Sequence, residues 1–110
     1  MAIQDSADKY VSIISSISGV AASSVEGVAS ISTDPGAMLD SFIGKRARSI
    51  RVDTVGNNAV IDITINARYG YKIPELVARI QEKVKSEVEK ATFYKVKSVN
   101  INIAGVVFNN

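Results

Sequence analysis

Residues 68–77 read Arg-Tyr-Gly-Tyr-Lys-Ile-Pro-Glu-Leu-Val, and they mark the place where a strand gives way to a helix. Gly70 can end a strand, because glycine adopts positive φ angles without strain. Pro74 suits the first helical turn, where its missing N–H would be unpaired in any case. The apolar residues that follow at helical spacing are Leu76, Val77, Ile80, Val84, Val88 and Ala91. The stretch therefore predicts a turn and then a long amphipathic helix over about residues 74–91.

Two segments upstream of this stretch, residues 50–55 and 59–68, predict a β-hairpin. The residues between them, Gly56-Asn57-Asn58, are of the types that tolerate positive φ in a tight turn. Small or branched apolar residues alternate with polar ones along residues 59–68, which is typical of a sheet with one buried and one solvent-exposed face. Residues 96–104 alternate in the same way and predict a last strand. It runs parallel to the second hairpin strand, but the sequence does not decide which strand it borders.

The N-terminal third predicts a helix that Asp5 or Ser6 caps. Its expected buried face consists of Ile13, Ile14, Ile17, Val20, Ala21 and Ser24. Gly19 within this helix suggests a close approach to another element. Residues 27–32 predict a short edge strand, and residues 38–43 predict a short helix. The expected fold class is therefore α/β (α+β): a two-layer sandwich whose mixed sheet has three or four strands, with the helices on one face.

Composition limits the possible functions of the chain. Its 110 residues predict a single domain over residues 1–110, with a core at roughly residues 6–108. The chain has no cysteine and no histidine, which excludes disulfides and removes the commonest general base and metal ligand. The net charge of +2 is too small to indicate a nucleic-acid binder. Neither a secretory signal nor an apolar run long enough to span a membrane is present, so we expect a cytoplasmic protein.

Three segments together resemble a known family. They are residues 17–28, residues 58–70, and residues 72–84 taken with the C-terminal segment 96–108. This combination is similar to the bacterial alkaline-shock protein family, also described as envelope stress response proteins and common in Gram-positive bacteria. The sequence departs from the usual family pattern at Arg68, where an acidic residue often precedes Tyr-Gly. It also departs at Thr92-Phe93-Tyr94, where the family usually has a glycine.

The resemblance implies a non-enzymatic cytoplasmic protein that self-associates and docks on other proteins. It implies a link to cell-envelope homeostasis, through a membrane-anchored partner protein, or to regulation of fatty-acid synthesis, through acetyl-CoA carboxylase. It implies no catalytic, cofactor-binding or metal-binding residues. Any membrane association is expected to pass through the partner.

Three parts of the predicted surface could carry a function. Asp53 and Asp62 share the predicted outer sheet face and could bind a cation, but an ordinary polar sheet face explains them as well. The basic run at residues 45–51, which ends at Arg51, supports an alternative function as a nucleic-acid-binding α/β module. The preferred hypothesis is an interaction surface on the outer sheet face and the adjoining turn. Its residues are Arg51, Asp62, Thr64, Asn66, Arg68, Tyr69, Tyr71, Lys72, Asn100 and Asn102.

Overall fold

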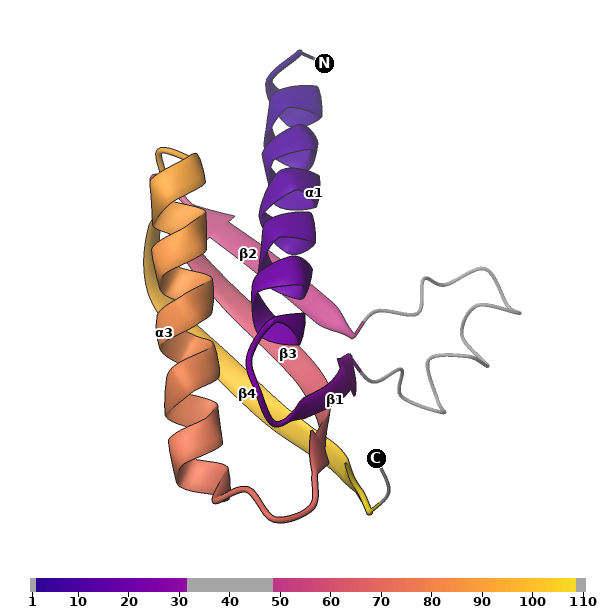
Figure 1. Cartoon of the computed structure of the whole chain (residues 1–110). Coiled ribbons are helices and arrows are strands. Elements are labelled where there is room, and N and C mark those ends of the chain that lie inside the picture. The colour runs from indigo at the N-terminus through magenta and orange to yellow at the C-terminus, as the bar shows by residue number, and fades with distance from the viewer. Residues whose placement is uncertain (1, 32–48, 109–110) are drawn as a thin grey trace, which may run out of the picture.

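The computed structural model describes residues 2–31 and 49–108, with side chains from residue 10 onward. Figure 1 shows two long helices beside a curved sheet. In chain order the elements are α1 (Ala2–Ser23), β1 (Val28–Ile31), β2 (Ile50–Val55), β3 (Asn58–Arg68), α3 (Ile73–Ala91) and β4 (Lys95–Val107). The short helix expected at 38–43 and the basic residues at 45–48 lie outside the described ranges.

The sheet is built around β3. On one side, β4 pairs with β3 in parallel along its whole length, from Asn58↔Lys95 to Arg68↔Val107. On the other side, β2 and β1 both pair with β3 in antiparallel fashion, one after the other. β2 ends its pairing at Ile63, and β1 resumes at Ile65. The mixed sheet of three or four strands expected from the sequence is confirmed with four, and β4 borders β3 rather than β2.

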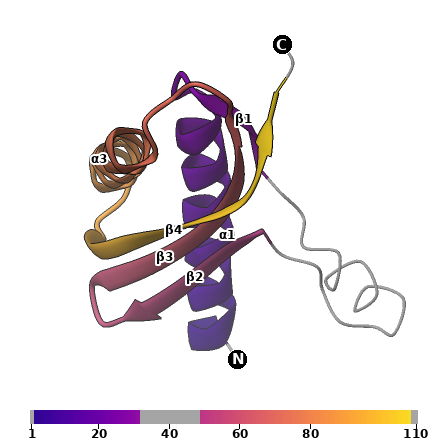
Figure 2. The ribbon, with the colours of Figure 1, turned by 90° about the horizontal axis from the view of Figure 1, so that it is seen from below.

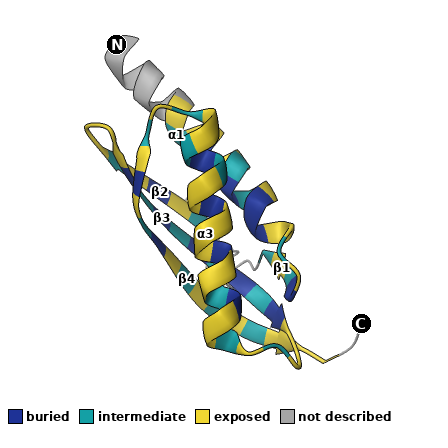
Figure 3. Ribbon diagram, turned by 60° about the vertical axis from the view of Figure 1, so that its left-hand side comes forward, coloured by how far each residue is buried: buried dark blue, intermediate teal, exposed yellow. Residues whose placement is uncertain are grey.

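Both helices cover the same face of the sheet, as the view in Figure 2 shows. α1 packs over β1 and β2, while α3 packs over β4 and against α1. The core lies between these two layers and contains the inward residues of β3, which are Ala59, Ile61, Ile63, Ile65 and Ala67. Figure 3 shows the resulting alternation of buried and less buried residues along β3. The predicted two-layer arrangement is therefore correct.

α1 differs from its prediction at two places. The helix begins at Ala2, before the predicted caps Asp5 and Ser6, because the residues before them contain no helix breaker. Its buried face is also rotated: Ile13, Val20 and Ser24, all expected inside, are exposed, Val20 to 72%, whereas Ser18 is fully buried. The small Ser18 and Gly19 let the helix approach the sheet, and a Cβ on Gly19 would lie 3.2 Å from Ile50 Cδ1. The expected close approach at Gly19 is thus confirmed.

The strands depart from strict alternation at three bulges. Register shifts fall between Val28 and Ser30 in β1, and opposite the Ala59–Val60 and Ile65–Asn66 steps of β3. The last shift moves Ala104 out of register, so that Gly105 pairs with Asn66 in its place. β4 therefore continues through Gly105 to Val107, beyond the predicted end at residue 104. A β-bulge accommodates the glycine without ending the strand.

α3 follows its prediction closely. It begins at Ile73 with Pro74 in the first turn, and its buried stripe is Leu76, Ile80, Val84 and Val88. Glu75 and Arg79, one helical turn apart, form an ion pair with 4.0 Å between Oε1 and Nη2. Near the end of the helix, the Glu89 carboxylate accepts a hydrogen bond from the Val96 N–H of β4.

Candidate functional site

The outer face of the sheet, on the side away from both helices, carries most of the interaction residues expected from the sequence. Along β3 these polar residues alternate with fully buried isoleucines. The strand register brings side chains of three strands together, because Arg51 lies opposite Asp62, and Asp62 lies opposite Asn100. The set placed on this face is Arg51, Asp62, Thr64, Asn66, Arg68, Asn100 and Asn102.

Cross-strand hydrogen bonds link side chains on this outer face. Asn100 Nδ2 donates to Asp62 Oδ1 at 2.8 Å, and Asn66 Nδ2 donates to Ser30 Oγ at 3.1 Å. Such pairs between neighbouring strands hold short polar side chains in defined positions on a sheet. Among residues 2–31 and 49–108, no helix lies over this face. The outer face is therefore a bare, ordered and mainly polar surface.

Of the turn residues Tyr69, Tyr71 and Lys72, it is Tyr71 that packs against the turn following α1. Tyr71 packs over Gly27, and its hydroxyl donates a hydrogen bond to Glu26 Oε2 at 2.9 Å. This hydrogen bond, with partial desolvation and the negative charge of Glu26, raises the pKa of Tyr71 above its usual value. Tyr71 therefore fastens the start of α3 to the turn that follows α1, so its geometry is that of a packing residue.

Tyr69 and Lys72 lie on either side of Tyr71 and differ from it. Tyr69 is 67% exposed, and its ring contacts the ring of Phe108 with centroids 4.9 Å apart. Lys72 occupies the N-cap position of α3 and makes no capping hydrogen bond through its side chain. The Tyr69–Phe108 contact links the end of β3 to the end of β4, where Val106 and Val107 are also partly exposed.

Sequence reasoning missed this apolar end of β4. The residues concerned are Val106, Val107 and Phe108, and their exposed fractions are 43%, 37% and 73%. Their signal was present in the sequence as a β-branched and aromatic run directly after Gly105. It was overlooked because Gly105 looked like the end of the strand.

The outer edge of β4 is partly covered by side chains from α3, which sequence reasoning also missed. Glu89 Oε2 accepts a hydrogen bond from the Val96 N–H at 2.8 Å, and Gln81 Nε2 donates one to the Val99 C=O at 2.8 Å. Figure 1 shows α3 crossing β4 at an angle, so that the C-terminal part of β4 extends beyond the helix. The helix thus satisfies backbone groups only in the first half of this strand.

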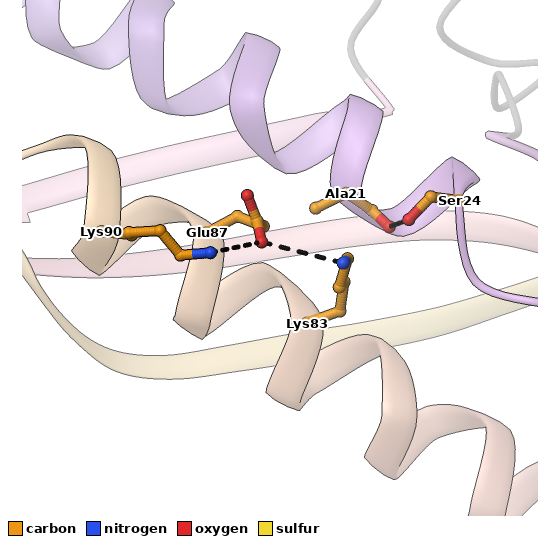
Figure 4. Close-up of polar contacts among 5 residues, drawn as sticks. All are labelled: Ala21, Ser24, Lys83, Glu87 and Lys90. Carbon is orange, nitrogen blue, oxygen red and sulfur yellow. Dashed lines mark hydrogen bonds and ion pairs between the residues drawn. The ribbon is translucent and has the colours of Figure 1, made fainter.

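A hollow of about 490 Å³ lies between α1 and α3 on the helix side. Its walls include the exposed Val20 and a small charged cluster on α3. Figure 4 shows this cluster, in which Lys83 and Lys90 both reach Glu87 Oε2, at 3.7 and 3.3 Å. These ion pairs are at least partly exposed, so they contribute little to stability. The hollow holds no group of side chains that resembles a reaction centre.

The described part of the chain offers little for metal or membrane chemistry. Among the side chains of residues 10–31 and 49–108, no cluster of three or more acidic or metal-ligating groups could hold a metal ion. Asp53 and Asp62 lie two register positions apart, because Asp53 faces Val60 while Arg51 faces Asp62. Asp62 instead accepts a hydrogen bond from Asn100 Nδ2 at 2.8 Å, which is an ordinary cross-strand contact. Of the described helices, none is long and apolar enough to span a membrane.

Two curated relatives are similar over most of this chain. An uncharacterized protein of Bacillus subtilis, YqhY, is 28% identical over 99 residues, covering 88% of this chain and 73% of the relative. An uncharacterized protein of Streptococcus pyogenes, Spy1535, is 32% identical over 97 residues, covering 86% of this chain and 74% of the relative. Neither name states an activity.

Solved structures of MamM CTD variants have a similar fold. One superposes with a TM-score of 0.55 at 15% identity and covers 88% of this chain and 96% of that one. A second has a TM-score of 0.54 at 18% identity with the same coverage. At this identity the likeness concerns the fold alone. The family model of the alkaline-shock protein 23 family, described as having a cell envelope-related function, matches residues 4–108. The chain therefore belongs to this family, as the three resembling segments suggested.

Proposed function

We propose that this chain is a non-catalytic interaction protein that self-associates and docks another protein of the cell envelope. The observation that carries the proposal is the bare outer face, where side chains from four strands lie in one ordered polar surface. A sheet with one uncovered face offers a broad contact area without any rearrangement of its backbone.

The side chains of the outer face suit contact with another protein. Asn, Thr and Asp dominate its centre, and these short side chains lose little conformational entropy when they are covered. The longer Arg51 and Arg68 lie at opposite ends of the patch, at the register positions of Asp62 and Val107. Arginine is favoured at protein interfaces, since its guanidinium makes several hydrogen bonds in a fixed geometry.

We propose a membrane-anchored protein as the docking partner and a cytoplasmic location for the chain. The support is the family's cell envelope-related description together with the resemblance noted above. Acetyl-CoA carboxylase is a second candidate partner, supported by the resemblance alone.

Self-association is tested by light scattering across a concentration series, at low and at high salt. We expect a mass above that of the 11.8 kDa monomer that persists at high salt. A monomer at every concentration would contradict self-association.

Docking is tested by co-sedimentation with Gram-positive envelope vesicles, before and after the vesicles are treated with protease. We expect binding to be lost after protease treatment and to be weakened by Thr64→Arg at the centre of the outer face. Glu82→Arg on the exposed side of α3 is the matched control and should bind normally. Undiminished binding to protease-treated vesicles or to pure lipid would exclude a protein partner.

A further inference from the structure

The two edges of the sheet differ in a way that points to the surface of self-association. One edge is made of β2 and β1 in turn, so it is interrupted between Ile31 and Ile50, and β2 carries the charges of Arg51 and Asp53. The other edge is β4, a continuous strand of 13 residues. No strand among residues 2–31 and 49–108 pairs with the outer edge of β4.

The backbone groups on this outer edge are divided between the two halves of β4. Val107 lies on the outer face beside Arg68, and its C=O accepts a hydrogen bond from the Tyr69 N–H at 2.8 Å. Residues of β4 whose side chains face outward therefore direct their N–H and C=O groups toward β3. In a strand the intervening residues direct their N–H and C=O groups the other way. At Val96 and Val99 the side chains of α3 hydrogen-bond these edge-directed groups. At Ile101 and Ile103, beyond the reach of those two side chains, the edge is open.

The open half of β4 also lacks the usual protection against strand pairing. Soluble proteins guard exposed edges with charged residues, proline or very short strands. From Ser98 to the end of the sequence there is no charged residue and no proline. Ile101 and Ile103 are only partly buried against the core, and Val106, Val107 and Phe108 are exposed. A partner strand on this edge would remove that apolar surface from water.

We propose that the open edge of β4 pairs in antiparallel fashion with β4 of a second copy, giving one continuous sheet through a two-fold axis near Asn102. This inference rests on the proposed self-association and names its contact as the β4 edge, which leaves the outer face free for the docking partner. In an isologous pairing, residue i of one copy faces residue j of the other, and residue j faces residue i. Because the open half of β4 is uncharged, this pairing brings no like charges opposite each other. The only charges of the strand, Lys95 and Lys97, then lie at opposite ends of the paired segment. A parallel pairing would bring the four lysines together.

The pairing has a defined geometry at its centre. Ile101 of one copy faces Ile103 of the other, so both edge-directed backbone positions gain hydrogen bonds. Asn102 faces its own counterpart as a non-hydrogen-bonded pair, in which Cα atoms are about 4.5 Å apart. A disulfide tolerates Cα separations of about 4.4–6.8 Å. A cysteine at this position should therefore cross-link the two copies.

The absence of native cysteine makes single-cysteine variants an unambiguous test. The β4 variants are Asn100→Cys, Asn102→Cys and Ala104→Cys, and the control on the opposite edge is Arg51→Cys; all four positions are exposed. Under mild oxidation we expect Asn102→Cys to form a covalent dimer about tenfold faster than the Arg51 control, since association raises the effective thiol concentration. Asn100→Cys and Ala104→Cys should cross-link more slowly than Asn102→Cys, because residue 100 of one copy faces residue 104 of the other. Equal rates for all four variants, or faster cross-linking through residue 51, would overturn the β4 assignment.

A charge-complementation experiment distinguishes this proposal from a general effect on folding. Asn102→Lys and Asn102→Glu should each lower the mass seen by light scattering, because like charges then oppose each other near the axis. An equimolar mixture of the two should restore the native mass. If native protein self-associates but neither variant weakens it, the proposed function stands and the β4 contact falls. If native protein is monomeric at every concentration, the proposed self-association and the β4 contact both fall, and docking rests on the vesicle experiment alone.

Discussion

The turn between α1 and β1 supplies a quantitative test of how this fold is closed. Gly27 has a φ of +105°, and its C=O accepts a hydrogen bond from the Arg68 N–H at 2.8 Å. A Cβ at this position would lie 2.9 Å from Leu76 Cδ1 and 2.9 Å from Tyr71 Cδ2. Leu76 is 1% exposed and Tyr71 is held by Glu26, so neither side chain has room to withdraw freely. The substitution Gly27→Ala should therefore add steric overlap to backbone strain.

Gly70 provides the matched control for this substitution. Its φ is +101°, close to that of Gly27, but a Cβ there would meet nothing within 4 Å. Gly70→Ala should cost only the strain of a side chain at positive φ, about 1–2 kcal/mol. Gly27→Ala should cost the same strain plus about 1–3 kcal/mol for overpacking. The expected difference between the two variants is therefore about 1–3 kcal/mol in the free energy of unfolding.

Urea unfolding followed by far-ultraviolet circular dichroism measures both variants under one condition. A total loss of about 2–5 kcal/mol for Gly27→Ala is a large share of the 5–15 kcal/mol typical of a domain. If both variants lose the same free energy, the close packing of Gly27 against Leu76 and Tyr71 contributes nothing and the reasoning is refuted. A change in the slope of the urea dependence would indicate an altered unfolded state instead.

Three further predictions concern single contacts. Ser18→Ala should stabilise the protein by about 1–3 kcal/mol, because the buried Ser18 Oγ has no hydrogen-bond partner among the described residues. The exposed Ser16→Ala controls for the difference in helix propensity between serine and alanine. A loss of stability in Ser18→Ala would contradict the burial argument. Glu89→Ala should lower the free energy of unfolding by about 1.5–3 kcal/mol, because it leaves the N–H of the buried Val96 without its charged acceptor. The control Glu82→Ala should change stability by less than about 0.5 kcal/mol. Equal effects of the two variants in urea unfolding would show that the hydrogen bond is unimportant. Because the pKa of Tyr71 is raised in the folded state, its contact with Glu26 stabilises the protein below about pH 10 and stops doing so as pH rises through the folded pKa. The urea midpoints of native protein and Tyr71→Phe should therefore differ below about pH 10 and converge at higher pH. A difference that stays constant with pH would exclude the contact as the cause.

Local sequence patterns were sufficient to predict the helix α3 and to predict which residues of the strands face the core. Pro74 and the apolar stripe from Leu76 to Val88 act within a few residues, and strand alternation follows from the backbone itself. Most of the candidate interaction residues were therefore placed correctly on the outer face before the fold was known. The exceptions are instructive, because Tyr71 depends on Glu26, which is 45 residues away in the sequence.

Long-range packing decided the features that the sequence left open and those for which its local pattern gave the wrong prediction. Val20 and Ser18 both fit a helical stripe, and the angle at which α1 meets the sheet selects Ser18 for burial. The position of β4 beside β3, the bulge that carries β4 past Gly105, and the use of Gln81 and Glu89 at its edge all depend on contacts between distant segments.

The sequence by itself determined the class of fold, the direction in which each strand faces and the family to which the chain belongs, because periodicity and turn chemistry are local properties. For residues 2–31 and 49–108, the tertiary structure alone decided which sheet edge is interrupted and charged and which is a continuous strand without a neighbour. The reason is that an edge is defined by the strand that is missing beside it, and no local pattern of residues records that absence.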